Sequence, residues 1–178
     1  MKLALYGGSF NPPHNGHISL ARHAVEALRP DKLIWMPSGD PPHKALPEGT
    51  PSGAHRLEMS RLAAAELGGI AEVSDFELAG GARYTIDTVK MLTARYQPEK
   101  LWLLLGSDMW DSFHSWYCAN ELRRLAEPFV VSRDIYPISS TELRKQLTVN
   151  NQQLTTDNIP LSVLDYIRKE GLYGVTVS

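Results

Sequence analysis

Two histidines, His14 and His17, stand three residues apart in a segment rich in glycine and proline that reads GGSFNPPHNGH over residues 7–17. The segment runs from a short apolar stretch into a pattern of helical period. Its glycines allow a ligand to approach the backbone closely, and the N-terminus of a helix presents unpaired N–H groups to phosphate. At this spacing the two histidines can face the same side and donate hydrogen bonds to one charged group. The segment therefore predicts a phosphate-binding site.

Other interpretations of this segment are a zinc site, a pair of capping histidines, or a tight turn built by the glycines and prolines. Zinc needs about four ligands, which His43, His55 or carboxylates would have to supply without a recognisable spacing. The single cysteine, Cys118, excludes an internal disulfide and a cysteine-based zinc site. We therefore expect no dedicated metal site. The glycine spacing matches neither G-x-G-x-x-G nor the phosphate loop of NTPases, so neither of those chemistries is indicated.

A second motif near the other end of the chain reads ISSTELR over residues 138–144. Ser139 and Glu142 have the spacing of a capping box, which explains part of the pattern without any ligand. It does not explain Arg144, which together with Ser140 and Thr141 would form a phosphate clamp beside a helix N-terminus. The two motifs together suggest a polyphosphate held between two helix N-termini.

These motifs need elements to position them, and short apolar runs alternate with segments of helical period along the chain. The alternation is typical of an α/β fold, and we predict a doubly wound, mostly parallel Rossmann-like sheet with helices on both faces. In open sheets of this kind the ligand binds at the carboxyl ends of the strands, around the topological switch point. The expected strands are Leu3–Tyr6, Lys32–Met36, Ile70–Ser74, Leu101–Leu105 and Phe129–Ser132, with a weaker one at Ile135–Ile138, and the expected helices are His17–Leu28, Ala54–Leu67, Thr85–Tyr96 and one that starts at Pro160 and is ended by Gly171.

The length of 178 residues predicts a single domain, 1–178, with a small C-terminal helical part at about 139–174. Pro37–Gly53 and the polar Leu147–Asn158 predict loops, the first of them near the carboxyl edge of the sheet. The formal net charge of -2 gives no strong field toward nucleic acid or a membrane surface, so we expect neither as a partner. No apolar run is long enough to span a bilayer and no signal peptide is evident, so we expect a cytoplasmic protein.

The pair GGSFNPPHNGH and ISSTELR resembles the signature of the H-x-G-H nucleotidyltransferase superfamily, and the segments between them narrow the resemblance to the nicotinate mononucleotide adenylyltransferases. These segments follow the order of that family and read PPHK at 41–44, RLEM at 56–59, YTIDT at 84–88, GSD at 106–108 and FHSW at 113–116. The C-terminal VLDYI at 163–167 and GLY at 171–173 match its last helix. The resemblance covers about residues 1–147 and 160–173.

This resemblance implies an enzyme of NAD biosynthesis that moves AMP from ATP to nicotinate mononucleotide, giving nicotinate adenine dinucleotide and pyrophosphate. The attacking phosphate is already ionised, so the reaction needs alignment and charge stabilisation and no general base. Mg²⁺ is expected to arrive on the ATP phosphates. His14, His17, Lys44 and Arg144 are the implied catalytic residues. Asp108 taken alone also fits the N-cap of a helix. The implied ATP-binding residues are Gly8, Ser9, Phe10, Gly106, Asp108, Ser139, Ser140 and Thr141.

Tyr84, Thr85 and Trp116 form the nicotinate pocket that the resemblance implies, with the ring stacked on the indole and the carboxylate on backbone N–H groups. A tryptophan taken alone is more often a core or groove aromatic. Arg56 and Arg133 are either anion partners or members of helix-surface salt bridges.

One departure from the family pattern keeps alternative functions open. Family members usually have a longer stretch before ISST, whereas here only residues 133–137 connect it to the preceding strand. A nucleotide-binding or regulatory homologue with reduced activity is therefore one alternative. Independently of this departure, an adenylyltransferase for nicotinamide mononucleotide or phosphopantetheine is another, although the segments at 84–88 and 113–116 favour a pyridine ring over the pantetheine arm. A tRNA-handling relative is disfavoured because the chain is slightly acidic. A homo-oligomer is compatible with the sequence.

Overall fold

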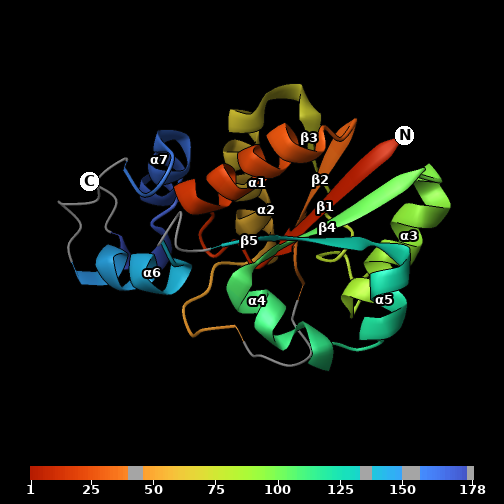
Figure 1. Cartoon of the computed structure of the whole chain (residues 1–178). Helices are drawn as coiled ribbons and strands as arrows, with labels where there is room; N and C mark the ends of the chain where they lie inside the picture. The colour runs from red at the N-terminus through yellow and green to blue at the C-terminus, as the bar shows by residue number, and fades with distance from the viewer. Residues whose placement is uncertain (40–45, 133–137, 150–156, 176–178) are drawn as a thin grey trace.

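A five-stranded parallel sheet forms the centre of the computed structural model, which describes residues 1–39, 46–132, 138–149 and 157–175. Its strand order in the described part of the chain is β3-β2-β1-β4-β5 (Figure 1). All four strand pairings are parallel, and β1 pairs with β2 on one side and with β4 on the other. The predicted doubly wound sheet is confirmed. The strands are β1 Lys2–Gly8, β2 Lys32–Pro37, β3 Ala71–Val73, β4 Lys100–Gly106 and β5 Glu127–Val131.

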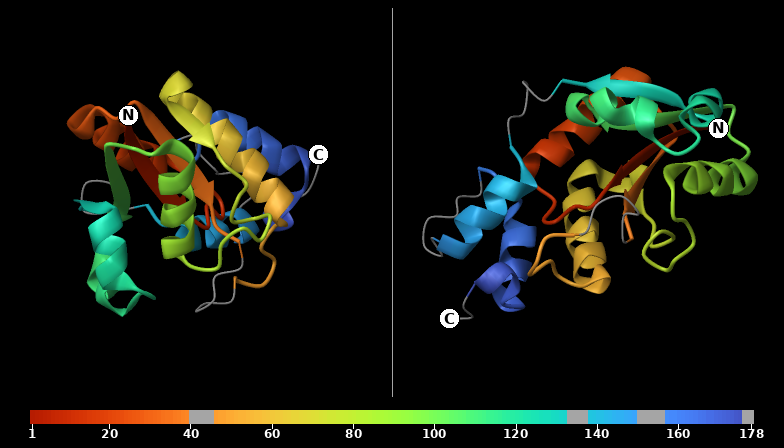
Figure 2. Two further views of the ribbon diagram at one scale, coloured as in Figure 1. Left: turned by 90° about the vertical axis from the view of Figure 1, so that its right-hand side faces the viewer. Right: turned by 90° about the horizontal axis from the view of Figure 1, so that it is seen from below.

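Helices cover both faces of this sheet because successive strand residues point to opposite sides. Ala4 and Tyr6 of β1 pack in one hydrophobic cluster with α1, α2, α6 and α7, whereas Leu3 and Leu5 pack in another with α3 and α5. The C-terminal helices α6 and α7 lie together at one end of the molecule (Figures 1 and 2). The helices are α1 Asn15–Leu28, α2 Gly53–Ala64, η1 Ala65–Ile70, α3 Thr85–Tyr96, α4 Ser107–Ser112, η2 Phe113–Ser115, α5 Ala119–Leu125, α6 Ser140–Val149, α7 Leu161–Lys169 and η4 Leu172–Gly174.

Some predicted boundaries are wrong for identifiable reasons. The helix expected to run to Leu67 changes after Ala64 into the short turn η1, in which Gly68 adopts a φ of 68° that glycine tolerates and other residues rarely do. The loop expected from Leu147 is still helical as far as Val149, at the end of α6. The predicted helices include no residue range for α4 or α5, because six and seven residues are too few to show a period.

Other expectations fall wholly or partly outside the described residues. Ile138 lies outside any described strand, and the rest of the weak strand predicted at Ile135–Ile138 is not described. The PPHK segment, which includes His43 and Lys44, also lies outside the described residues, and so does Arg133. Among the helices that the structure describes, none combines the length and the apolar character needed to cross a bilayer.

Candidate active site

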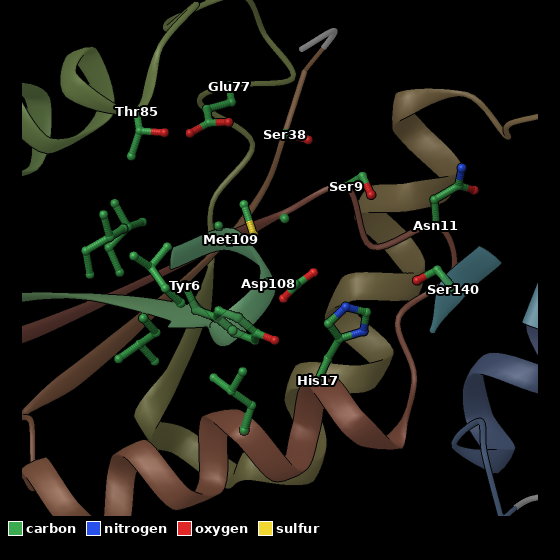
Figure 3. A pocket seen from close by; sticks show the side chains of 18 of the residues that line it. Tyr6, Ser9, Asn11, His17, Ser38, Glu77, Thr85, Asp108, Met109 and Ser140 are labelled. Atoms are coloured by element: carbon green, nitrogen blue, oxygen red, sulfur yellow. The ribbon is translucent and has the colours of Figure 1, made fainter. Parts of the chain in front are cut away.

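A cavity of about 560 Å³ opens at the carboxyl ends of β1 and β4, next to the point where the strand order reverses (Figure 3). This is the position that the sequence predicts for the site. The loops after parallel neighbouring strands reach the same edge of a sheet, so the residues that follow β1 and β4 meet here. Among the expected site residues, those that line the cavity are Gly8, Ser9, His14, His17, Tyr84, Thr85, Gly106, Asp108, Trp116, Ser139, Ser140, Thr141 and Arg144.

The two histidines lie at the start of α1, where the backbone holds their rings together. His14 is the N-cap residue and is 2% exposed. Its backbone N–H donates to Nδ1 of His17 at 3.2 Å, and the two rings stack with centroids 3.7 Å apart. Because Nδ1 of His17 accepts this hydrogen bond, the proton of the neutral ring belongs on Nε2. Figure 3 shows the His17 ring pointing from α1 into the cavity, where Nε2 can serve as a donor.

Phe10 packs beneath the site and does not line the cavity, so the ATP-binding role implied for it stays a prediction. Its side chain is 1% exposed, and its ring contacts those of Trp35 and His17 at centroid distances of 4.6 and 5.1 Å. A Cβ at Gly8 would lie 3.1 Å from the Phe10 ring, so glycine at this position leaves room for that ring. A Cβ at Gly7 would meet nothing within 4 Å, which leaves the end of β1 open toward the cavity.

Asn11 is a site residue that sequence reasoning missed, and side chains from one loop and two helices hold it in place. Its Nδ2 donates to Oγ1 of Thr50 at 2.8 Å, and its Oδ1 accepts from the hydroxyl of Tyr173 at 2.8 Å. Its main-chain oxygen accepts from Nη1 of Arg144 at 2.7 Å. Asn11 is 1% exposed and lines the cavity. An Asn-Pro pair signals a turn, but no sequence signal could name these partners.

The second motif begins α6 and contacts the first motif directly. Oγ of Ser140 donates to the main-chain oxygen of Pro12 at 3.0 Å, and Nη2 of Arg144 donates to Oγ1 of Thr141 at 3.2 Å. The N–H of Glu142 donates to Oγ of Ser139 at 3.2 Å, which is the capping contact expected from the spacing. The N-terminus of α6 therefore faces the same cavity as the start of α1, although the two motifs lie at opposite ends of the chain.

The opposite end of the cavity, which we call the aromatic end, is formed by Tyr84, Thr85, Trp116 and Tyr117. Tyr84 is the N-cap residue of α3, and its backbone N–H donates to Oδ2 of Asp87 at 3.1 Å. The rings of Tyr84 and Tyr117 stack with centroids 4.4 Å apart. Figure 3 places Thr85 on the far side of the cavity from His17 and Ser140. One end of the cavity is therefore polar and suited to binding phosphate, and the other end is aromatic.

Arg83 and Glu77 also line the cavity, and the sequence analysis overlooked both of them. The hydroxyl of Thr88 donates to Oε1 of Glu77 at 2.7 Å. Burial raises the pKa of the Glu77 carboxyl above its usual value, although this hydrogen bond opposes the shift. Arg83 is exposed and lies over the ring of Tyr84. Isolated charged residues of this kind carry no motif that would have identified them.

Asp108 and Arg56 each occupy a position that removes one of the interpretations open for them. Gly106 is the N-cap of α4, so Asp108 lies inside its first turn and the N-cap interpretation of Asp108 is wrong. Arg56 is 2% exposed, which excludes a helix-surface salt bridge. Its Nη1 donates to the main-chain oxygens of Ser9 and Ser38 at 3.0 and 2.7 Å, so it joins the segments that follow β1 and β2. Arg56 does not line the cavity.

In the described part of the chain, no group of three or more His, Cys, Asp or Glu side chains is arranged so that it could hold a metal ion.

Comparison with known proteins places this cavity in context. The family model described as cytidylyltransferase-like matches residues 5–146. Two relatives are named probable nicotinate-nucleotide adenylyltransferase. The one from Borreliella afzelii is 32% identical over 97% of both chains, and the one from Lactococcus lactis is 34% identical over 97% of this chain and 95% of its own. A solved structure of the nicotinic acid mononucleotide adenylyltransferase of Plasmodium falciparum, complexed with NaAD, superposes with a TM-score of 0.77 over 99% of both chains at 19% identity.

Proposed function

We propose that this chain, which belongs to the cytidylyltransferase-like family and within it to the nicotinate-nucleotide adenylyltransferases, transfers AMP from ATP to nicotinate mononucleotide. The products are nicotinate adenine dinucleotide and pyrophosphate. The observation that carries the proposal is the cavity, in which two helix N-termini with histidine, hydroxyl and arginine side chains face an aromatic end. Its volume of about 560 Å³ lies within the range of roughly 300–1,000 Å³ common for small-molecule sites.

In this reaction a phosphate oxygen of the mononucleotide attacks the α-phosphate of ATP, and pyrophosphate leaves. The nucleophile is ionised at neutral pH, so the protein has to align the two phosphates and stabilise the developing charge. We assign the Nε2 proton of His17 to an oxygen of the ATP phosphates, since the hydrogen bond at Nδ1 leaves Nε2 as the donor. His14 stacks on His17 and supports the orientation of its ring.

We assign the β and γ phosphates to the start of α6. Ser139, Ser140 and Thr141 surround a helix N-terminus there, which attracts anions through its N–H groups and its dipole. Nη1 of Arg144 donates to Asn11, which fixes the guanidinium at the edge of the cavity, where its charge acts on the leaving group. Lys44 would add a second cation. Mg²⁺ enters on the triphosphate as part of the substrate and neutralises charge on the leaving pyrophosphate.

The aromatic end is the proposed position of the pyridine ring. Tyr84, Trp116 and Tyr117 present ring surfaces to the cavity, and the N-terminus of α3 begins there at Thr85. Such an N-terminus offers backbone N–H groups to the carboxylate of the ring. Asp108, in the first turn of α4 between the two ends, is placed to accept hydrogen bonds from the ribose or adenine of ATP.

The short connection at 133–137 motivated the alternative of a homologue that binds nucleotide without turnover. The contacts of Ser140 and Arg144 with Pro12 and Asn11 favour the enzyme, because α6 reaches the first motif despite the short connection.

The test is pyrophosphate release by the purified protein with ATP and Mg²⁺, comparing nicotinate mononucleotide, nicotinamide mononucleotide and phosphopantetheine, with the product identified by mass. We expect nicotinate adenine dinucleotide from the first substrate. ATP binding without product from any of the three would replace the enzyme with the binding homologue.

Two substitutions of His17 separate its donor from its capping role. His17→Asn keeps an acceptor at the position of Nδ1 and removes the Nε2 donor, whereas His17→Gln keeps a donor near Nε2. We expect kcat to fall about 10²-fold to 10³-fold in His17→Asn and less in His17→Gln. His23→Ala, on the exposed side of the same helix, is the control and should keep kcat. Equal kcat in His17→Asn and the unmodified protein would refute the assignment.

A further inference from the structure

Arg83 brings a positive charge to the aromatic end of the cavity. It directly precedes Tyr84, lines the cavity and has an exposed side chain. Its Cζ lies 5.7 Å from the centroid of the Tyr84 ring, and that ring stacks on Tyr117. A guanidinium over an aromatic face is held by a cation–π interaction, which limits the positions it samples. The guanidinium is thereby kept at the rim of the aromatic end.

The other charges along the cavity make this position distinctive. In the described part of the chain Arg83 has no ion pair with an acidic side chain, whereas Arg144, at the other end, already donates to Asn11 and Thr141. The acidic residues that line the cavity in the described part of the chain are Asp108, which lies between the two ends, and Glu77, whose carboxyl accepts a hydrogen bond from Thr88. Burial favours the neutral form of Glu77, so this group opposes an incoming anion less than an exposed carboxylate would. An anion at this end would find Arg83 as its cationic partner among the described residues.

We propose that Arg83 determines specificity by pairing with the ring carboxylate of nicotinate mononucleotide. This rests on the proposed function and deepens it by adding a residue that selects the acid over the amide. Nicotinate and nicotinamide mononucleotides share their ribose and phosphate and differ only in a carboxylate or carboxamide on the ring. A guanidinium donates two parallel hydrogen bonds to a carboxylate, whereas the NH₂ group of a carboxamide is itself a donor and cannot accept the second one.

The experiment measures KM and kcat for both mononucleotides at saturating ATP and Mg²⁺ in Arg83→Gln and Arg83→Lys. We expect Arg83→Gln to raise KM for nicotinate mononucleotide about fivefold to twentyfold, a range below that of a buried pair because the side chain is exposed. KM for nicotinamide mononucleotide and both kcat values should change less than about twofold, since the amide makes no charged contact. Arg83→Lys keeps the charge without the planar pair of donors, so its KM for nicotinate mononucleotide should lie between those of the unmodified protein and Arg83→Gln.

Arg95→Gln is the matched control. Arg95 is also exposed and also lies over the tyrosine that follows it, with Cζ 5.1 Å from the Tyr96 ring, but it stands at the other end of α3 and does not line the cavity. Its substitution should change KM for neither substrate.

Two results would overturn the proposal. An equal rise in KM for both mononucleotides would mean that Arg83 contacts a group they share, such as the phosphate. Unchanged KM values in Arg83→Gln would mean that it contacts neither. If the unmodified protein turns over neither substrate, the proposed function fails, but the role of Arg83 can still be tested. The dissociation constants of the two mononucleotides are then compared between the unmodified protein and Arg83→Gln. A preference for the acid that Arg83→Gln abolishes would support the role of Arg83 in that case too.

Discussion

Tyr173→Phe removes one oxygen atom that joins the C-terminal segment to the site. The hydroxyl of Tyr173 donates to Oδ1 of Asn11 at 2.8 Å, and burial raises the pKa of this phenol, which keeps it protonated and able to donate at any pH of interest. Phenylalanine fills the same space, so the change leaves no cavity behind. The effect should therefore come from the lost hydrogen bond and from its consequence for Asn11.

The size of the effect follows from the burial of Asn11. At 1% exposure, its Oδ1 cannot take a hydrogen bond from bulk water in place of the phenol. A buried acceptor left without its donor costs about 1–3 kcal/mol. For a chain of this size each kcal/mol lowers the melting temperature by about 2–4 °C. We therefore expect Tyr173→Phe to lower it by about 2–12 °C.

Activity should fall together with stability, because Asn11 lies in the cavity wall. Asn11 holds Arg144 through its main-chain oxygen, so a shift of the Asn11 loop displaces the cation assigned to the leaving group. A displacement well below 1 Å should lower kcat about threefold to tenfold, since a full 1 Å can cost about 10²-fold. KM for the mononucleotide should stay unchanged, because the aromatic end is not touched.

The assay combines a thermal melt with steady-state kinetics, and Tyr166→Phe is the control. The hydroxyl of Tyr166 also bonds a side chain from the N-terminal half, Nδ1 of His55 at 2.9 Å, but neither residue lines the cavity. Tyr166→Phe should lower stability to a smaller degree and leave kcat unchanged. Loss of kcat in both variants to the same extent, or in neither, would refute the role of the Tyr173–Asn11 contact.

Two further predictions concern Glu77 and the backbone beside it. Because burial raises the pKa of the folded-state Glu77 carboxyl above its usual value, Glu77 contributes stability that is fully present below the unfolded pKa and is lost as pH rises through the folded pKa. Glu77→Gln should therefore gain in melting temperature over the unmodified protein as pH rises from about 4 to 7, and a constant difference across that range would contradict this. Gly39→Ala places a Cβ 2.6 Å from the main-chain oxygen of Glu77 and should cost about 1–3 kcal/mol by denaturant titration, whereas Gly69→Ala, whose Cβ meets nothing within 4 Å, should change the free energy of unfolding by less than about 0.5 kcal/mol. Equal losses in the two glycine variants would show that the contact with Glu77 is not responsible.

The sequence predicted the sheet and the helix starts because those depend on local patterns. β1, β2 and β4 each contain an apolar run whose successive residues pack into the two clusters on opposite faces of the sheet. α3 begins and ends at the predicted residues, Thr85 and Tyr96. The end of α2 escaped prediction because its apolar period continues past Ala64, while the chain turns at Gly68. Periodicity identifies the face of a helix better than it identifies the last residue.

The residues of the site that could be predicted are likewise those that belong to a local sequence motif. Residues inside a motif, such as His17 and Arg144, could be named from spacing alone, and the structure places both in the cavity wall. Asn11 could not, because its partners Thr50, Arg144 and Tyr173 lie far away in the chain. Glu77 and Arg83 could not either, because each is an isolated charged residue whose place in the cavity wall only the fold reveals. The bond between Arg144 and Asn11 joins residues separated by 133 positions, and single-sequence patterns carry no record of such a pair.

The strand order explains why motifs at opposite ends of the chain can act on one substrate. With β1 next to β4, the loop of residues 9–13 and the start of α4 meet at one edge, and α6 follows β5 onto the same edge. The N-termini of α1 and α6 then converge, and bringing two positive dipole ends together is costly unless an anion lies between them. The hydrogen bonds of Ser140 and Arg144 to Pro12 and Asn11 hold that arrangement before any ligand binds. In the proposed reaction the triphosphate therefore enters a site whose positive groups are already in place, and its binding energy can be used to align the α-phosphate with the mononucleotide.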